Sequence, residues 1–278
     1  MNKNLLIILC GFFCFQASFS KTKVNTKCVA HRGNNKYFLE NSIQAVKSAS
    51  SIGADAIEID IRHTKDGHAI LMHDSTLKRV AKNKLNKVCP LNRKIKKLNI
   101  IDIRSNCILK NNEEIPLLIE ALESINLSKT AWFIELKDVP NRNTYNIIKS
   151  YIPSYQDKKI ISFKSKALNK IKRFTQGQDN HIDIEMFKLY YVYLFHKSGF
   201  HADVKFTPFN FRRLNRKPKR IKKAIWTIDS SKKIEKALKA KIEYITTNDP
   251  ELCLFLKNRM SKILRSNNRL STFKNLKL

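Results

Sequence analysis

Acidic side chains occur at alternate positions in two short apolar runs of the sequence. In the run IEIDI, Glu58 and Asp60 alternate with isoleucines, and in the run FIELK the same spacing pairs Glu135 with Lys137. Successive side chains of a β-strand point to opposite faces, so each run separates its polar residues from its apolar ones. Where the apolar face packs against helices, the carboxylates point into the interior of the fold.

Carboxylates that meet inside a protein need a compensating charge, because burial without one is strongly unfavourable. A divalent cation is one solution, and the all-oxygen set of Glu58, Asp60 and Glu135 suits Mg²⁺ or Ca²⁺ better than zinc. A buried salt-bridge network is the other solution, in which Lys137 and Arg62 neutralise the acids. The two runs alone leave both arrangements open.

Two histidines end apolar runs elsewhere in the chain. His31 precedes Arg32 and Gly33, and His73 follows the run ILM. A lone histidine at a strand end is usually structural, but two of them near acids and an arginine indicate acid–base chemistry around neutral pH. Arg32 and Lys137 are suited to hold a phosphate group, since a guanidinium binds two of its oxygens at once.

The elements that position these residues alternate along the chain. Strands are expected at Cys28–His31, Ala54–Arg62, Ala69–His73, Ala131–Lys137, Lys159–Phe163, Ile182–Met186, Ala202–Phe206, Ala224–Ile228 and Tyr244–Thr247. Helices are expected at Glu40–Ile52, Ile115–Ile125, Thr144–Tyr151, Lys166–Phe174 and Lys232–Ala240. This alternation predicts parallel βα units, and about eight of them predict an α/β fold, a TIM (β/α)₈ barrel. His31 and His73 would then lie at the carboxyl ends of strands, where barrels build their active sites.

The barrel is predicted over residues 27–260. Residues 75–114 lack the alternation and are interpreted as a small insertion after the third strand motif. Residues 261–278 are polar and basic, and we expect a frayed basic tail there.

The first twenty residues have the layout of a secretory signal peptide. A charge-free stretch from Asn4 to Ser20 follows Lys3, and Ala17–Ser20 offers small residues for cleavage after Ser20. The chain is therefore expected to be exported, to the periplasm or outside the cell. The alternative is an uncleaved N-terminal membrane anchor, since the stretch approaches the minimum length of a span.

Removal of residues 1–20 would leave four cysteines, which can form two disulfides in three pairings. Cys89 and Cys107 flank one basic loop, so we favour that pair, and Cys28 would then join Cys253. The alternative is four free thiols, and no cysteine has the spacing of a zinc site.

Basic residues dominate the composition: 54 Lys and Arg against 23 Asp and Glu give a formal net charge of +31. They concentrate at Arg79–Lys97 and at Arg212–Lys223. Such runs could bind an anionic membrane peripherally, or they could be solvated loops. No nucleic-acid partner is expected, because neither run interleaves aromatic residues and an exported protein seldom meets nucleic acid.

A set of motifs in fixed order identifies a family. In chain order they are His31-Arg32-Gly33, Glu40-Asn41-Ser42, Gly53-Ala54-Asp55, Glu58-Ile59-Asp60, Thr64-Lys65-Asp66-Gly67, His73-Asp74, Ile115-Pro116-Leu117, Glu135-Leu136-Lys137, Trp226-Thr227-Ile228 and Thr247-Asn248-Asp249-Pro250. Together they resemble the glycerophosphodiester phosphodiesterase family over nearly the whole chain after residue 27. Residues 175–223 carry little that aligns, and Leu39 stands where the family usually has proline.

The resemblance implies a TIM barrel whose roles fall on eight residues. It implies a divalent metal, Mg²⁺ or Ca²⁺, on Glu58, Asp60 and Glu135, an acid–base pair of His31 and His73, phosphate binding by Arg32 and Lys137, and an alcohol pocket lined by Trp226. The implied activity is metal-dependent hydrolysis of glycerophosphodiesters to glycerol 3-phosphate and an alcohol.

Two alternatives stay open. One is a related barrel enzyme that cleaves intact lipids, such as a phospholipase or sphingomyelinase D-type or phosphatidylinositol-cleaving phosphodiesterase. The other is a cationic protein that binds membrane surfaces without catalysis.

Overall fold

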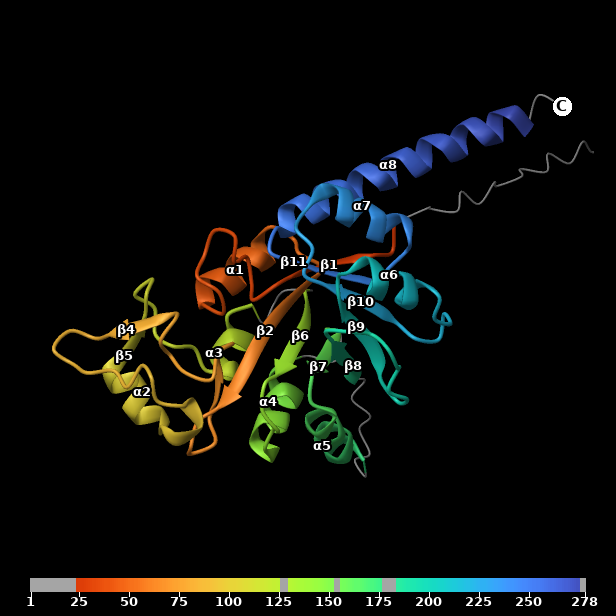
Figure 1. Cartoon of the computed structure of the whole chain (residues 1–278). Helices are drawn as coiled ribbons and strands as arrows, with labels where there is room; N and C mark the ends of the chain where they lie inside the picture. The colour runs from red at the N-terminus through yellow and green to blue at the C-terminus, as the bar shows by residue number, and fades with distance from the viewer. Residues whose placement is uncertain (1–23, 126–129, 153–155, 177–183, 276–278) are drawn as a thin grey trace, which may run out of the picture.

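A computed structural model describes residues 24–125, 130–152, 156–176 and 184–275. Within them, eight parallel strands close into a barrel, confirming the predicted TIM-barrel class (Figure 1). Their order around the barrel is β1 (Lys27–Ala30), β11 (Tyr244–Thr247), β10 (Lys223–Trp226), β9 (His201–Lys205), β8 (Ile184–Tyr190), β7 (Lys158–Ser162), β6 (Ala131–Leu136) and β2 (Ala56–His63). The pairing of β1 with β2 closes the ring. The strand expected from Ile182 begins outside the described residues.

The alternation of the two acidic runs determines which side chains face the barrel interior. Ile57, Ile59 and Ile61 of β2 pack outward in a core that includes Leu118 and Leu122. Deeper in the interior, below the acids, Phe133, Phe187 and Tyr244 form part of an apolar plug with tilted and edge-on ring contacts. The barrel is thus filled with side chains, and the acid cluster lies above this plug at the mouth.

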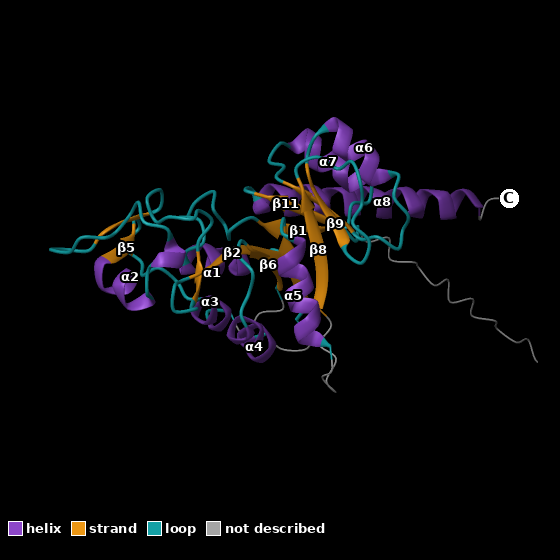
Figure 2. Cartoon of the chain, turned by 60° about the horizontal axis from the view of Figure 1, so that its bottom comes forward, coloured by secondary structure: helices purple, strands orange, loops and turns teal. Residues whose placement is uncertain are grey.

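Helices cover the barrel from outside (Figures 1 and 2). They are α1 (Ile43–Ser51), α3 (Leu118–Glu123), α4 (Arg142–Tyr151), α5 (Ser165–Thr175), α6 (Pro208–Asn215), α7 (Ser231–Lys239) and α8 (Pro250–Asn275). The described residues between β8 and β9 form no helix, so a ten-residue connection, Tyr191–Phe200, takes the place of one. Helix α6 was not predicted, because its three hydrophobic residues are embedded in a strongly basic segment.

The third predicted strand is not a barrel strand, so the expectation that His73 ends one is wrong. β3 (Ala69–Leu71) pairs antiparallel with the end of β2, because β2 runs past the barrel rim and the chain turns back at Gly67. The backbone N–H of Met72 donates to the carbonyl of Asp60 at 2.9 Å. The hairpin therefore returns His73 to the level of the acids, at the mouth of the barrel.

Residues 75–114 fold around a small core of their own. They contain β4 (Ala81–Asn83), η1 (Ile95–Lys97), α2 (Ile100–Asn106) and β5 (Cys107–Leu109), and β4 pairs antiparallel with β5. The disulfide between Cys89 and Cys107 lies within this core. Figures 1 and 2 both place this unit on the side of the barrel away from the projecting end of α8.

A second disulfide joins the first strand of the barrel to the C-terminal helix. Cys28 of β1 and Cys253 of α8 are bonded although 225 positions separate them, so both favoured pairings are confirmed. Nearby, the buried ammonium of Lys257 lies 2.7 Å from each carboxylate oxygen of Asp55.

The frayed end expected after residue 260 is wrong for most of its length, since α8 continues as a helix to Asn275. The proposed signal segment, residues 1–20, lies outside the described residues. None of the helices in the described residues is both long and apolar enough to cross a bilayer.

Candidate active site

Three carboxylates meet inside the mouth of the barrel. β2 and β6 pair in register, which sets Asp60 directly opposite Glu135, and Glu58 lies one inward position below Asp60. One oxygen from each of the three groups lies within 4.8 Å of the others, and all three residues are buried. The sequence pattern that pointed both strands' acids inward therefore led to one cluster.

Two cations neutralise part of this cluster. The ammonium of Lys137 lies 3.0 Å from Asp60 Oδ1 and 2.7 Å from Glu135 Oε1, and Arg32 Nε lies 3.1 Å from Asp60 Oδ2. Burial alone would raise the pKa of Asp60, but Lys137 and Arg32 outweigh it and lower that pKa. Arg62, the other cation expected here, instead donates to the carbonyl of His73 and pairs with Asp138.

Glu58 differs from the other two acids because it forms no ion pair with a Lys or Arg side chain of the described residues. Its Oε2 accepts a hydrogen bond from the backbone N–H of Arg32 at 2.8 Å, and its buried Oε1 has no hydrogen-bond partner among the described residues. Burial raises its pKa well above the usual range, and the charges of Asp60 and Glu135 add to this effect. Burial, with Asp60, also raises the pKa of Glu135 to about 7.

The donor set fits a divalent cation. Three hard oxygen ligands converge, one buried oxygen lacks a partner, and two protein cations leave one of three acids uncompensated. The salt-bridge network is formed by Lys137 and Arg32 instead of the expected Lys137 and Arg62, and its two cations face three acids.

The turn after β1 brings Arg32 to the acids. Arg32 and Gly33 both have left-handed backbone conformations, with φ values of 55° and 81°. A Cβ on Gly33 would lie 2.6 Å from the backbone carbon of Ala45, so only glycine fits this close approach. Such strain in Arg32 is typical of functional sites, where surrounding contacts hold a residue in an unfavourable conformation.

Asn41 fixes the position of Asp60. Its side chain donates to Asp60 Oδ2 at 2.9 Å and accepts from the Asp60 backbone N–H at 3.0 Å. Asn41 is buried and left-handed, with φ of 57°, a conformation that asparagine tolerates better than most residues.

His31 reaches the cluster from β1. Its Nδ1 lies 2.7 Å from Asn248 Oδ1, and Asn248 in turn donates its side-chain N–H to Asp229. Because an amide oxygen only accepts, Nδ1 carries the proton and Nε2 is free, 4.0 Å from Glu58 Oε2. Burial and the charge of Arg32 lower the pKa of His31 to about 4, so the imidazole is neutral at neutral pH.

His73 comes from the hairpin of β2 and β3 and has a carboxylate partner. Its Nδ1 lies 2.7 Å from Asp74 Oδ1, which leaves Nε2 free. Arg79 holds Asp74 and also contacts both oxygens of Glu40, while Glu40 accepts from Arg32 at 3.0 Å. A continuous chain of charges therefore links the two histidine neighbourhoods.

Trp226 stands with two further aromatic residues on the other side of the mouth. Phe163 and Tyr191 stack with ring centroids 4.5 Å apart, and Trp226 meets both edge-on at 5.6 and 5.4 Å. We call these three residues the aromatic wall. Phe163 and Tyr191 follow β7 and β8, and Trp226 ends β10, whereas the acid cluster and its cations come from β1, β2 and β6. The aromatic wall and the acid cluster therefore lie on different sides of the mouth.

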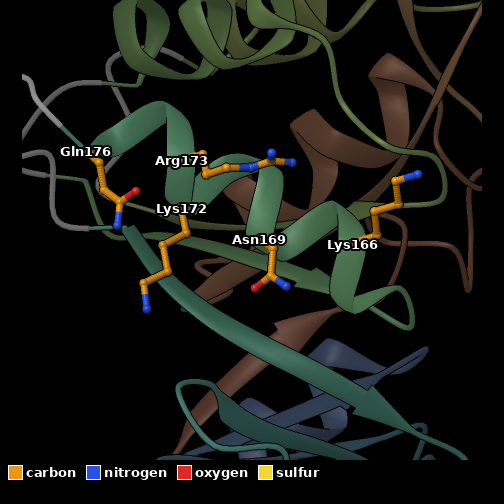
Figure 3. Close-up of a pocket in the computed structure, with 5 residues that line it drawn as sticks. All are labelled: Lys166, Asn169, Lys172, Arg173 and Gln176. Atoms are coloured by element: carbon orange, nitrogen blue, oxygen red, sulfur yellow. The ribbon is translucent and has the colours of Figure 1, made fainter.

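One of the cavities borders the site on the side of His31. A hollow of 550 Å³ lies beside His31 and Arg32 and reaches Asp229 and Asn248. Another hollow of 590 Å³ lies on the outer face of α5, lined by Lys166, Asn169, Lys172, Arg173 and Gln176 (Figure 3). The α5 hollow is built from a single helix and offers cations and amides without an acid or histidine, so it lacks the groups for acid–base chemistry.

Several supporting residues escaped the sequence reasoning. Asn41, Asp74 and Asn248 belong to motifs noted there but had no role of their own, and Arg79 was only the first member of a basic run. Asp229 was missed altogether. Asp74, Asp229 and Asn248 follow strands, but this position does not reveal their partners, such as His31, which lies 217 positions from Asn248.

Comparison with known proteins identifies relatives across the chain. The model of the glycerophosphoryl diester phosphodiesterase family matches residues 31–252. A glycerophosphodiester phosphodiesterase of Caldanaerobacter subterraneus subsp. tengcongensis is 30% identical over 247 residues, covering 84% of this chain and 98% of that protein. A human lysophospholipase D is 36% identical over 109 residues, covering 37% of this chain and 34% of its own.

Solved structures show the same fold. A phosphodiesterase of Oleispira antarctica, in complex with sn-glycerol-3-phosphate, superposes with a TM-score of 0.68 at 18% identity, covering 84% of this chain and 96% of its own. The family match includes all eight site residues named from the sequence. The match to the Caldanaerobacter relative, at 30% identity, covers 98% of that protein. The chain therefore belongs to the glycerophosphoryl diester phosphodiesterase family.

Proposed function

We propose that this member of the family hydrolyses glycerophosphodiesters to glycerol 3-phosphate and an alcohol, with a divalent cation, Mg²⁺ or Ca²⁺, held by Glu58, Asp60 and Glu135. The observation that carries the proposal is the convergence of three buried acids within 4.8 Å in the barrel mouth. A bound cation would supply Lewis-acid polarisation of the phosphate and lower the pKa of a coordinated hydroxyl group. The name of the relative at 30% identity supports the substrate class.

Arg32 and Lys137 bind the phosphate group in this proposal. Each keeps donors to spare, because a guanidinium has five N–H groups and an ammonium three. Arg32 uses two groups on Asp60 and Glu40, and Lys137 uses two on Asp60 and Glu135. The remaining donors can stabilise the negative charge that grows on the phosphoryl oxygens in the transition state.

The histidines transfer the protons. A water molecule attacks directly, or the glycerol hydroxyl of the substrate attacks first and water then opens the resulting cyclic phosphate. In either case the attacking oxygen gives its proton to Nε2 of one histidine as it bonds to phosphorus. The bond from phosphorus to the alcohol oxygen breaks, and Nε2 of the other, protonated histidine supplies a proton to that oxygen. Asn248 and Asp74 hold the two rings with Nε2 available for these transfers. The aromatic wall, including Trp226, receives the alcohol group.

A panel of soluble glycerophosphodiesters tests the activity. We expect glycerol 3-phosphate to be released, EDTA to abolish release, and Mg²⁺ or Ca²⁺ to restore it, because the acid cluster is one cation short. Enzymatic measurement of glycerol 3-phosphate with and without chelator gives the result. Full activity in EDTA after dialysis would contradict the metal dependence, and no release from any diester would contradict the substrate class.

Cleavage of intact lipid is the second candidate function. The aromatic wall favours it, because it offers an apolar surface to the alcohol side of the phosphate, and one relative is named a lysophospholipase D. Analysis of products from lysophosphatidylcholine beside those from glycerophosphocholine separates the two candidates.

We also propose that the chain is exported by residues 1–20, with the uncleaved anchor as the alternative. Two disulfides support this proposal, since such bonds persist in oxidising compartments. We expect the intact mass of protein recovered from its native cell to lack residues 1–20. A mass that includes them would favour the anchor.

A further inference from the structure

An unusual group of apolar side chains begins at Tyr191 of the aromatic wall and continues along α6. The helix-free connection between β8 and β9, Tyr191–Phe200, is called the rim loop here. Phe195 is 84% exposed and Val192 60% exposed, and Leu194 of this loop and Phe209 at the start of α6 are also exposed. Single exposed apolar residues are ordinary, but a cluster in one loop indicates a contact surface.

The rim loop is held firmly in this position. The buried side chain of Asn210 accepts from the backbone N–H of Tyr193 at 2.8 Å and donates to the carbonyl of Tyr191 at 2.8 Å. Arg213 donates to the carbonyl of Leu194 at 2.6 Å, and Tyr193 packs inside the protein. The apolar tips are therefore turned outward by a hydrogen-bonded scaffold.

The charge around the loop specifies the kind of partner. Residues 191–213 contain four lysines and arginines, Lys197, Lys205, Arg212 and Arg213, and a single acid, Asp203, which is buried inside the barrel. Lys197, Lys205 and Arg212 are exposed in or near the rim loop. A partner must therefore present negative charge at its surface and an apolar layer that can take up protruding aliphatic and aromatic tips. An anionic bilayer provides both at the depth of its headgroups.

We propose that the rim loop and Phe209 insert into the headgroup layer of an anionic membrane and hold the barrel mouth against it. The loop begins at Tyr191 of the aromatic wall, so the membrane contact adjoins that side of the barrel mouth. A diester that carries an acyl chain could then reach the site without leaving the lipid. This contact goes beyond the hydrolysis proposed above, and its measurement does not depend on activity.

Co-sedimentation with vesicles tests the contact on the full chain. We expect binding to vesicles of phosphatidylcholine with about one quarter phosphatidylglycerol, weak binding to pure phosphatidylcholine, and release in about 0.5 M salt. The double substitution Val192→Ser/Phe195→Ser should weaken binding at least ~10-fold, since it removes two inserted apolar groups without changing charge. Both proteins share residues 1–23, so the difference between them reports the loop alone.

A matched control removes exposed apolar groups elsewhere. Leu85 and Val88, 88% and 82% exposed, lie next to lysines in the insertion, and Leu85→Ser/Val88→Ser should bind vesicles like the wild type. Hydrolysis of soluble glycerophosphocholine should be unchanged in both variants, which shows that they fold. The proposal is overturned if the wild type does not bind anionic vesicles, which is the result expected if the loop instead binds an acidic protein. It is also overturned if the rim-loop variant binds the vesicles as well as the wild type.

Discussion

Replacing Glu58 by glutamine is expected to reduce turnover of a glycerophosphodiester at least ~10³-fold. The substitution keeps the shape of the side chain and its contact with the Arg32 backbone but removes one of three negative charges. The cluster then has two acids against Lys137 and Arg32, so its demand for a further cation disappears. Steady-state release of glycerol 3-phosphate measures the loss.

A thermal measurement separates this explanation from misfolding. Mg²⁺ or Ca²⁺ should raise the melting temperature of the wild type, because it relieves repulsion among buried acids, and should leave Glu58→Gln almost unchanged. Without metal the variant should melt no lower than the wild type. The control is Glu185→Gln, which changes a carboxylate at the start of β8 that pairs with Lys159 at the opposite end of the barrel. Wild-type activity in Glu58→Gln would remove Glu58 from the site.

Removal of either histidine is expected to have an effect of similar size. His31→Ala and His73→Ala should each lose at least ~10³-fold in turnover, because each deletes one of two proton transfers. The control is His68→Ala: His68 lies in the turn after β2, is exposed, and has its side chain beside Asp66. A variant of His31 or His73 with normal turnover would contradict the two-histidine mechanism.

The leaving group can then assign the two roles. A nitrophenyl ester of glycerol phosphate releases a stable anion that needs no proton, so the variant that lacks the general acid should recover most of its lost rate. The variant that lacks the general base should not recover. Loss of the same size on both substrates in both variants would assign the histidines to positioning rather than proton transfer.

The sequence predicted the strands of the barrel and the inward direction of its acids because both depend on local period. Alternation over five residues is enough to put Glu58 and Asp60 on one face, and the tight pairing of β2 with β6 adds Glu135. The histidines and Arg32 were found at the ends of apolar runs, and the family resemblance implied the same roles for them.

The remainder depends on contacts between distant parts of the chain. The bond between His31 and Asn248 spans 217 positions, and the ion pair of Arg79 with Glu40 joins the insertion to the first turn of the barrel. The hairpin of β2 and β3 was misread as a barrel strand because a three-residue apolar run looks alike in parallel and antiparallel pairing. The rim loop had no sequence signal beyond its aromatic residues, since exposure is a property of the folded chain.

The bond between Cys28 and Cys253 also determines how the molecule would respond to mechanical load. A tension applied to the two ends of the chain passes directly through this covalent link, which encloses everything from β2 to β11. Only the residues before Cys28 and the part of α8 beyond Cys253 can be drawn out. The barrel itself would carry no force, and stretched single molecules should extend by its contour length only after the bond is reduced.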